Sequence, residues 1–149
     1  MNAMVLNRVK TPLELKRVPI PNPTPNEVLL KVNACAVCRT DLHIYDGELT
    51  EPKLPLILGH QIVGRVTSIG NQVQQIKVGD RIGIPWLGGT CHTCQYCKSD
   101  HENLCDNPTF IGYQKDGGYA EFTTAHEDYC FPLPDSFSDT EAAPLLCAV

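Results

Sequence analysis

Four of the eight cysteines of this chain lie within one short polar stretch, GTCHTCQYCKSDHENLC, at residues 89–105. Three are separated by two residues each and the fourth follows after seven more: Cys91, Cys94, Cys97 and Cys105. A tight loop with this spacing can place four thiolates around one tetrahedral ion, and zinc fits such a shell best. Because four thiolates leave no position open for a substrate, the spacing predicts a structural zinc in loop 89–106.

Clustered cysteines can also form disulfides, do redox chemistry or fill a core. The N-terminal stretch 1–20 carries charges every few residues and lacks the apolar run and cleavage site of a signal peptide. We therefore expect a reducing, cytoplasmic setting, in which clustered thiols more often bind metal than cross-link. Disulfides, or four separate buried or free cysteines, remain as alternatives. His92 and His101 are expected to be solvated, since four thiolates already complete the shell.

Composition limits the other possibilities. With 149 residues and 42% hydrophobic content, the chain fits one globular domain with a core. A net charge of -5 argues against a surface for nucleic acid or for an anionic membrane, so we expect neither partner. No apolar run approaches the length of a membrane span.

Short apolar stretches rich in Val, Ile and Leu recur along most of the chain and are typical of strands. The best are 27–37, 61–70, 80–86, 119–125 and 128–133. Only the C-terminal stretch has a helical pattern, because Ser138 and Glu141 have capping-box spacing, and Pro144 should break or kink the helix near its end. Many short strands with long loops predict a mainly β, barrel-like domain.

The other four cysteines are Cys35, Cys38, Cys130 and Cys147, and His60 is the histidine to consider with them. A catalytic zinc typically takes three Cys and His ligands and keeps one position open. Cys38, His60 and Cys147 would supply such a set, although spacing alone does not select them. Cys35 and Cys130 lie in apolar strands and are expected in the core. CAVC at 35–38 could instead be a redox dithiol, but no βαβ pattern surrounds it.

Five motifs occur in one order along essentially the whole chain: CRTDLH (38–43), GHQIVGRV (59–66), the cysteine loop, GGYAEF (117–122) and AAPLLCA (142–148). In this the chain resembles zinc-dependent medium-chain alcohol dehydrogenases. The resemblance implies a GroES-like catalytic domain over 1–149, a partly open β-barrel with short helical segments. It also implies a catalytic zinc on Cys38, His60 and Cys147.

The family activity would be reversible oxidation of an alcohol to an aldehyde or ketone, with hydride transfer to NAD or NADP. By resemblance, Thr40 and His43 form a proton relay, and Arg39 meets the cofactor pyrophosphate, for which a guanidinium is suited. Asp41 matches the carboxylate that orients the zinc-bound histidine. Trp86 matches a wall of the substrate pocket. The alternatives are a turn residue for Thr40, a surface residue for His43 and a core residue for Trp86.

Two departures from the family pattern stand out. Gln61 occupies the position of the usual glutamate beside the zinc-binding histidine, which removes a negative charge near the metal. No G-x-G-x-x-G occurs, so we expect the Rossmann domain that binds the nicotinamide to follow residue 149, in an enzyme that is a homo-oligomer at full length and inactive as this fragment. A non-catalytic zinc module and a zinc hydrolase remain rival functions, although no H-E-x-x-H is present.

Overall fold

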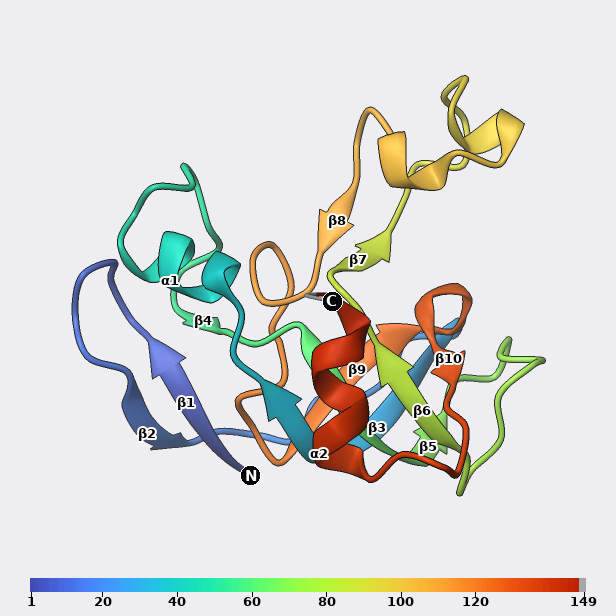
Figure 1. The fold of residues 1–149 in the computed structure, drawn as a ribbon, viewed down its shortest axis with the longest axis horizontal. Coiled ribbons are helices and arrows are strands. Elements are labelled where there is room, and N and C mark those ends of the chain that lie inside the picture. Colours follow the sequence, from blue (N-terminus) through green and yellow to red (C-terminus); the bar gives the residue numbers. More distant parts are fainter. Residues whose placement is uncertain (148–149) are drawn as a thin grey trace.

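The computed structural model describes residues 1–147, which form three open antiparallel sheets (Figure 1). The five-stranded sheet has the order β10 (Phe131–Pro132), β6 (Arg81–Ile84), β5 (Gln61–Ile69), β3 (Glu27–Ala36) and β9 (Phe122–His126). The three-stranded sheet has the order β2 (Glu14–Arg17), β1 (Asn2–Leu6) and β4 (Leu56–Ile57). The two-stranded ribbon pairs β7 (Leu87–Gly89) with β8 (Thr109–Phe110).

The mainly β prediction is confirmed, and the sheets stay open rather than closing into one barrel. All five predicted strand regions contain a strand, although β10 covers only Phe131–Pro132 because Glu127–Tyr129 forms the 3-10 turn η3. Sequence reasoning missed five strands: β1, β2, β4, β7 and β8. The last four of these are very short, polar or glycine-rich, so their apolar pattern is weak.

The long strands β3 and β5 form the centre of the five-stranded sheet and supply much of its core. Val28 and Leu30 of β3 pack with Ile62 and Val66 of β5 and with Ile82 of β6. Each such buried side chain stabilises the fold by about 1.5–3 kcal/mol. Two register shifts in the β3–β5 pairing interrupt the ladder. Both strands lead to the site, since β3 ends just before Cys38 and β5 begins just after His60.

The expectation that only the C-terminal end is helical is wrong, because α1 (Arg39–Tyr45) comes soon after β3. The backbone N–H of Cys38 donates to Asp41 Oδ2 at 2.8 Å, so a carboxylate in the first turn caps the helix. The usual N-cap residues are Ser, Thr, Asp and Asn. With Cys38 in that place, the sequence carries no ordinary start signal for this short helix.

The C-terminal helical segment forms as predicted. Helix α2 (Asp139–Ala142) begins after Ser138, whose backbone N–H donates to Glu141 Oε2 at 2.9 Å. The chain then tightens into the 3-10 turn η4 (Ala143–Leu146), which contains Pro144. Figure 1 shows both lying across the five-stranded sheet, where Ala142 and Ala143 pack against Val63. This packing brings the end of η4 to the start of β5.

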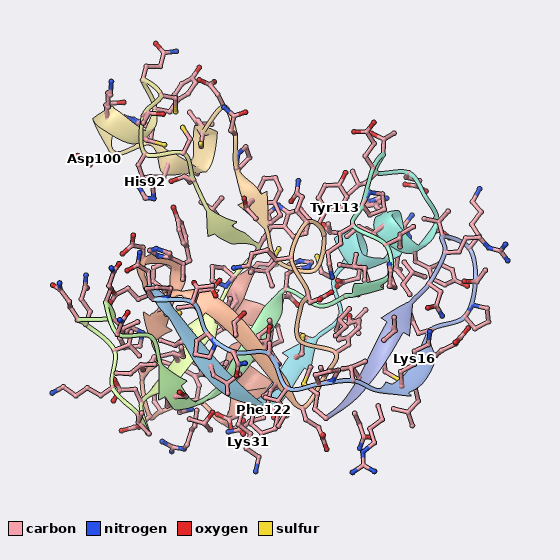
Figure 2. All side chains as sticks on the ribbon, turned by 180° about the vertical axis from the view of Figure 1, so that it is seen from behind. Lys16, Lys31, His92, Asp100, Tyr113 and Phe122 are labelled. Carbon is pink, nitrogen blue, oxygen red and sulfur yellow. The ribbon has the colours of Figure 1, made fainter. Side chains whose placement is uncertain are left out.

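Residues 90–108, which we call the cysteine lobe, project away from the sheets on the β7–β8 ribbon (Figure 1). The lobe contains two short 3-10 turns, η1 (Cys97–Ser99) and η2 (Glu102–Leu104). Figure 2 shows the lobe from behind, with His92 and Asp100 on it. Both histidines of the lobe, His92 and His101, are exposed, as predicted. No helix among residues 1–147 is both long and apolar enough to cross a bilayer.

Candidate metal centres

The four sulfurs of the cysteine lobe converge on one point. The Sγ atoms of Cys91, Cys94, Cys97 and Cys105 all lie within 4.8 Å of one another. Cys97 Sγ is 3.5 Å from that of Cys94 and 4.0 Å from that of Cys91. In a tetrahedral zinc shell with bonds of about 2.3 Å, neighbouring sulfurs would be about 3.8 Å apart. No disulfide joins any of the eight cysteines, and the spacing is that of a metal shell.

Backbone N–H groups point at these sulfurs and favour their ionised form. The N–H groups of Cys91 and Asn107 donate to Cys105 Sγ at 3.3 and 3.4 Å, and that of Cys94 donates to Cys91 Sγ at 3.4 Å. Hydrogen bonds from Thr93 and Cys94 lower the pKa of the Cys91 thiol to about 6. Burial and the neighbouring sulfurs raise the pKa of Cys97 to about 11. Four sulfurs so close cannot all ionise without a cation between them, so the lobe fits zinc.

A second cluster forms where three distant parts of the chain meet. Cys38 lies at the start of α1, His60 lies between β4 and β5, and Cys147 follows η4. Their ligand atoms all lie within 4.8 Å of one another, and the two sulfurs are 3.9 Å apart. Cys38 and His60 are buried, whereas Cys147 is exposed. Three ligands with one exposed side match a metal site that keeps a position open.

His60 gives the strongest indication that this cluster binds a metal ion. Its side chain is fully buried, and neither ring nitrogen has a hydrogen-bond partner of good geometry among residues 1–147. Nδ1 lies 3.3 Å from Asp41 Oδ1, which leaves Nε2, without a partner among residues 1–147, as the nitrogen free to bind a cation. A buried nitrogen of this kind is costly unless something binds it. A cation between His60 and the two sulfurs would satisfy it, so these residues fit zinc.

Asp41 holds the two sides of this site together. Its Oδ2 accepts from the Cys38 N–H at 2.8 Å, and its Oδ1 accepts from the Gly59 N–H at 3.0 Å. The side chain is buried. Burial opposes ionisation of Asp41, but His60 and these N–H donors outweigh it and hold the carboxyl pKa below its usual value. In turn, Asp41 raises the pKa of His60 against the effect of burial. The predicted orienting carboxylate therefore lies beside the predicted histidine ligand.

The remaining predicted residues lie around this cluster. Thr40 Oγ1 is 3.8 Å from Cys38 Sγ. Arg39 is exposed at the start of α1.

Two further predicted residues lie beside His60 and Cys147. The buried Gln61 donates from Nε2 to the Pro144 carbonyl at 3.5 Å. Trp86 packs edge-on against His60, with ring centroids 4.8 Å apart. His43 lies on α1, three residues after Thr40, and is not among the clustered ligands.

Sequence reasoning missed several neighbours of these residues. Glu48 contacts Nδ1 of His43 through its carboxylate. Phe110 and Tyr113 stack on Trp86, with ring centroids 4.6 and 6.0 Å away, and extend its apolar surface. Tyr119 packs near Asp41, whose negative charge adds to burial in raising the pKa of the tyrosine. None of these four lies at a spacing that sequence periodicity could detect, because the fold brings them in from distant or irregular parts of the chain.

Cys35 and Cys130 belong to the core, as predicted. Cys130 is buried in the main apolar cluster, and Cys35 packs against that cluster. Burial raises the pKa of each thiol to about 12. A thiol with such a pKa is a poor nucleophile and a poor redox partner at neutral pH, which argues against the dithiol interpretation of 35–38.

Comparison with known proteins agrees with this architecture. Residues 24–135 match the family model described as the alcohol dehydrogenase GroES-like domain. The chain belongs to this family. An alcohol dehydrogenase of Geobacillus stearothermophilus is 48% identical over 149 residues, which is 99% of this chain and 44% of that protein. The chain thus spans less than half the length of this relative.

Solved structures of the GroES-like family superpose closely on the chain. The crystal structure of an NAD-dependent alcohol dehydrogenase matches with a TM-score of 0.92 and 31% identity, covering 98% of this chain and 43% of that one. A cinnamyl alcohol dehydrogenase of Sorghum bicolor matches with a TM-score of 0.89 and 29% identity, covering 99% and 44%. The GroES-like fold predicted from the five motifs is therefore confirmed.

Proposed function

We propose that residues 1–149 form the catalytic domain of a zinc-dependent alcohol dehydrogenase, which converts a small alcohol to an aldehyde or ketone, reversibly, with NAD or NADP. The observation that carries the proposal is the fully buried His60, whose Nε2 has no partner within residues 1–147, placed between two sulfurs and a supporting carboxylate. Family membership and the relatives' names support the same activity.

Zinc on Cys38, His60 and Cys147 would supply a Lewis acid, and two thiolates with a neutral imidazole would balance its charge. The chain's own residues would place the alcohol and remove its proton. Trp86, with Phe110 stacked on it, gives an apolar wall beside His60. A substrate carbon held there is shielded from water, which favours transfer of hydride over competing reactions.

The proton of the alcohol would leave along α1. Thr40 lies beside Cys38, and His43 is one turn further along the same helix, with 36% of its side chain exposed. Residues three apart share a helix face, so the two would relay a proton from the site towards solvent by way of the bound cofactor's ribose. Glu48 contacts Nδ1 of His43, which leaves Nε2 for this path.

The dinucleotide would be bound mainly by residues that the longer relatives have beyond this stretch, with the exposed Arg39 contributing to its pyrophosphate. Assembly of full-length copies into a homo-oligomer is part of the same proposal. We also place the protein in the cytoplasm, where its eight free thiols would stay reduced.

The rival functions are less well supported. A non-catalytic zinc module would need only the cysteine lobe and predicts Cys38 far from His60, whereas their ligand atoms lie within 4.8 Å. A zinc hydrolase needs a general base at the open side of the metal. The neighbouring Gln61 cannot act as a base, because its side chain is a neutral amide.

The proposal can be tested in the full-length protein by measuring zinc content and alcohol-dependent reduction of NAD and NADP. His60→Asn should lose one of two zinc ions and at least about 100-fold in turnover, because one ligand is removed. His101→Asn is the matched control, since His101 is exposed in the cysteine lobe, and it should keep both zinc ions and full turnover. Unchanged zinc content in His60→Asn would contradict the proposal.

A further inference from the structure

The motif GGYAEF at 117–122 has no role in the proposed chemistry, yet its first residues lie directly against the segment that carries His60. Three backbone N–H groups of residues 117–119 donate to carbonyls of residues 57–59, at 2.7, 2.9 and 3.0 Å. Gly59 is followed at once by His60. The motif therefore fixes the backbone from which the histidine ligand projects.

This close approach depends on glycine. A Cβ on Gly117 would lie 2.0 Å from the Gly59 carbonyl oxygen, so no larger residue fits there. Gly59 itself has φ of +95°, and a Cβ on it would lie 2.6 Å from Cδ1 of Tyr119. The ring of Tyr119 is thus pressed against the residue whose N–H donates to Asp41.

The phenol oxygen of Tyr119 is buried. It is without a hydrogen-bond partner of good geometry in the described part of the chain. Buried hydroxyl groups nearly always find a partner. The nearby charged group is the Asp41 carboxylate, which accepts from the Gly59 N–H at 3.0 Å and which, together with the larger effect of burial, raises the pKa of the Tyr119 phenol. A carboxylate has about four acceptor sites, and the N–H groups of Cys38 and Gly59 use two of them.

We propose that Tyr119 is a positioning residue whose phenol donates to Asp41, and that this bond holds the carboxylate that orients His60 towards a metal ion. The inference rests on the proposed metal site. The two N–H donors hold one carboxylate oxygen each, and the phenol would add a further hydrogen bond. Without it, the carboxylate could turn and the His60 ring could tilt with it, which weakens the ligand without removing it.

The test uses the full-length protein with zinc kept in the cysteine lobe and Co²⁺ titrated into the second site, followed by the thiolate-to-cobalt absorption band. Loss of a residue that orients a ligand typically costs 10–100-fold in metal affinity. Tyr119 acts one step further out, so Tyr119→Phe should weaken Co²⁺ binding by about 3–10-fold. Tyr129→Phe is the matched control, because its phenol bonds to Thr90 Oγ1 at 2.7 Å, and it should leave Co²⁺ affinity unchanged.

A double-mutant cycle shows whether Tyr119 acts through Asp41. In an Asp41→Asn background, Tyr119→Phe should change Co²⁺ affinity by less than about 2-fold, because the carboxylate it supports is gone. An equal loss in both backgrounds, or a loss of urea stability with unchanged Co²⁺ affinity, would overturn the inference. If the unmutated protein binds no Co²⁺ at this site, the proposed function fails and the inference fails with it.

Discussion

The Gln61 side chain is a fully buried amide that lies between the two segments carrying His60 and Cys147. Its Nε2 donates to the carbonyl of Pro144. Burial and Cys38 raise the pKa of the Cys147 thiol, and the Gln61 side chain acts against that rise. An amide can donate to both acceptors, whereas a carboxylate cannot. The residue that departs from the family pattern therefore has a structural use here, as a tie between the His60 strand and the Cys147 turn.

From this arrangement we predict the effect of Gln61→Glu in the full-length protein. Zinc content should stay the same, because the substitution leaves Cys38, His60 and Cys147 in place, with their ligand atoms within 4.8 Å of one another. A new negative charge beside the site disfavours loss of a proton there, so the pH dependence of turnover should move to higher pH by about 0.5–1 unit. Gln61→Met, which adds no charge, is the control. A pH profile that coincides with that of the unmutated enzyme would count against this prediction.

At the scale of elements, α2 is attached to the five-stranded sheet by a network around Arg81. Its Nε donates to Asp139 Oδ1 at 2.7 Å, and its two terminal nitrogens donate to the carbonyls of Pro134 and Phe137. The second oxygen of Asp139 accepts from Asn33 Nδ2 at 2.9 Å. Since η4 and Cys147 follow α2, the same network helps to set the position of Cys147, the third of the proposed ligands.

This network predicts an acid-dependent stability. The hydrogen bond from Arg81 is the main reason that the pKa of Asp139 lies below its ordinary value. A lowered folded-state pKa gives stability above the ordinary carboxyl pKa of about 3.9, and that stability is lost as pH falls through the folded-state value. Asp139→Asn should therefore cost about 1 kcal/mol at pH 7, and the difference from the unmutated protein should shrink as pH falls below the ordinary carboxyl pKa.

Urea unfolding at pH 7 and at low pH measures this difference. Asp135→Asn is the control, because Asp135 is an exposed carboxylate of the preceding loop that makes no ion pair within residues 1–147, and its effect should be near zero at both pH values. A cost for Asp139→Asn that is the same at both pH values would mean that the carboxylate charge is not the source of the stability.

The two candidate metal sites could be predicted from the sequence to different degrees, because one is local in the chain and the other is assembled by the fold. The cysteine lobe is local, so the spacing of Cys91, Cys94 and Cys97 indicated a shell directly. Cys38, His60 and Cys147 come together only through the fold, and only the family resemblance selected them. Helix α1 was missed because its capping signal is Asp41 combined with an unusual N-cap residue. Neighbours such as Tyr119 depend on loop packing, which leaves no periodic signal.

At the scale of the whole molecule, the cysteine lobe and the body are stabilised by different means. No residue of the lobe belongs to the apolar clusters found within residues 1–147, which lie in the body. The lobe would therefore depend on its metal, since structural zinc contributes about 10–16 kcal/mol in small zinc-binding peptides. The body has a core of its own and needs no such ion.

We therefore predict that Cys97→Ser releases one zinc ion and unfolds the lobe alone. Amide hydrogen exchange should rise across residues 90–108 by several orders of magnitude, while β3 and β5 keep their protection. His92→Asn is the control within the lobe, because His92 is exposed and has φ of 55°, a conformation that asparagine tolerates. Equal loss of protection in the body and in the lobe would show that the two fold as one unit.

The β7–β8 ribbon makes the lobe a detachable insertion. Gly89 pairs with Thr109, so the 19 residues between them leave and re-enter the body at adjacent points. A two-residue Asn-Gly turn can close such an antiparallel pair. An in-frame replacement of residues 90–108 by Asn-Gly should give a smaller protein that still folds. Its free energy of unfolding, measured by thermal unfolding, should fall by about 1 kcal/mol, because the hydrogen bond between the Thr90 and Tyr129 hydroxyls is lost. Aggregation of the shortened chain would refute this. A module joined in this way can be gained, lost or exchanged without any other change to the body.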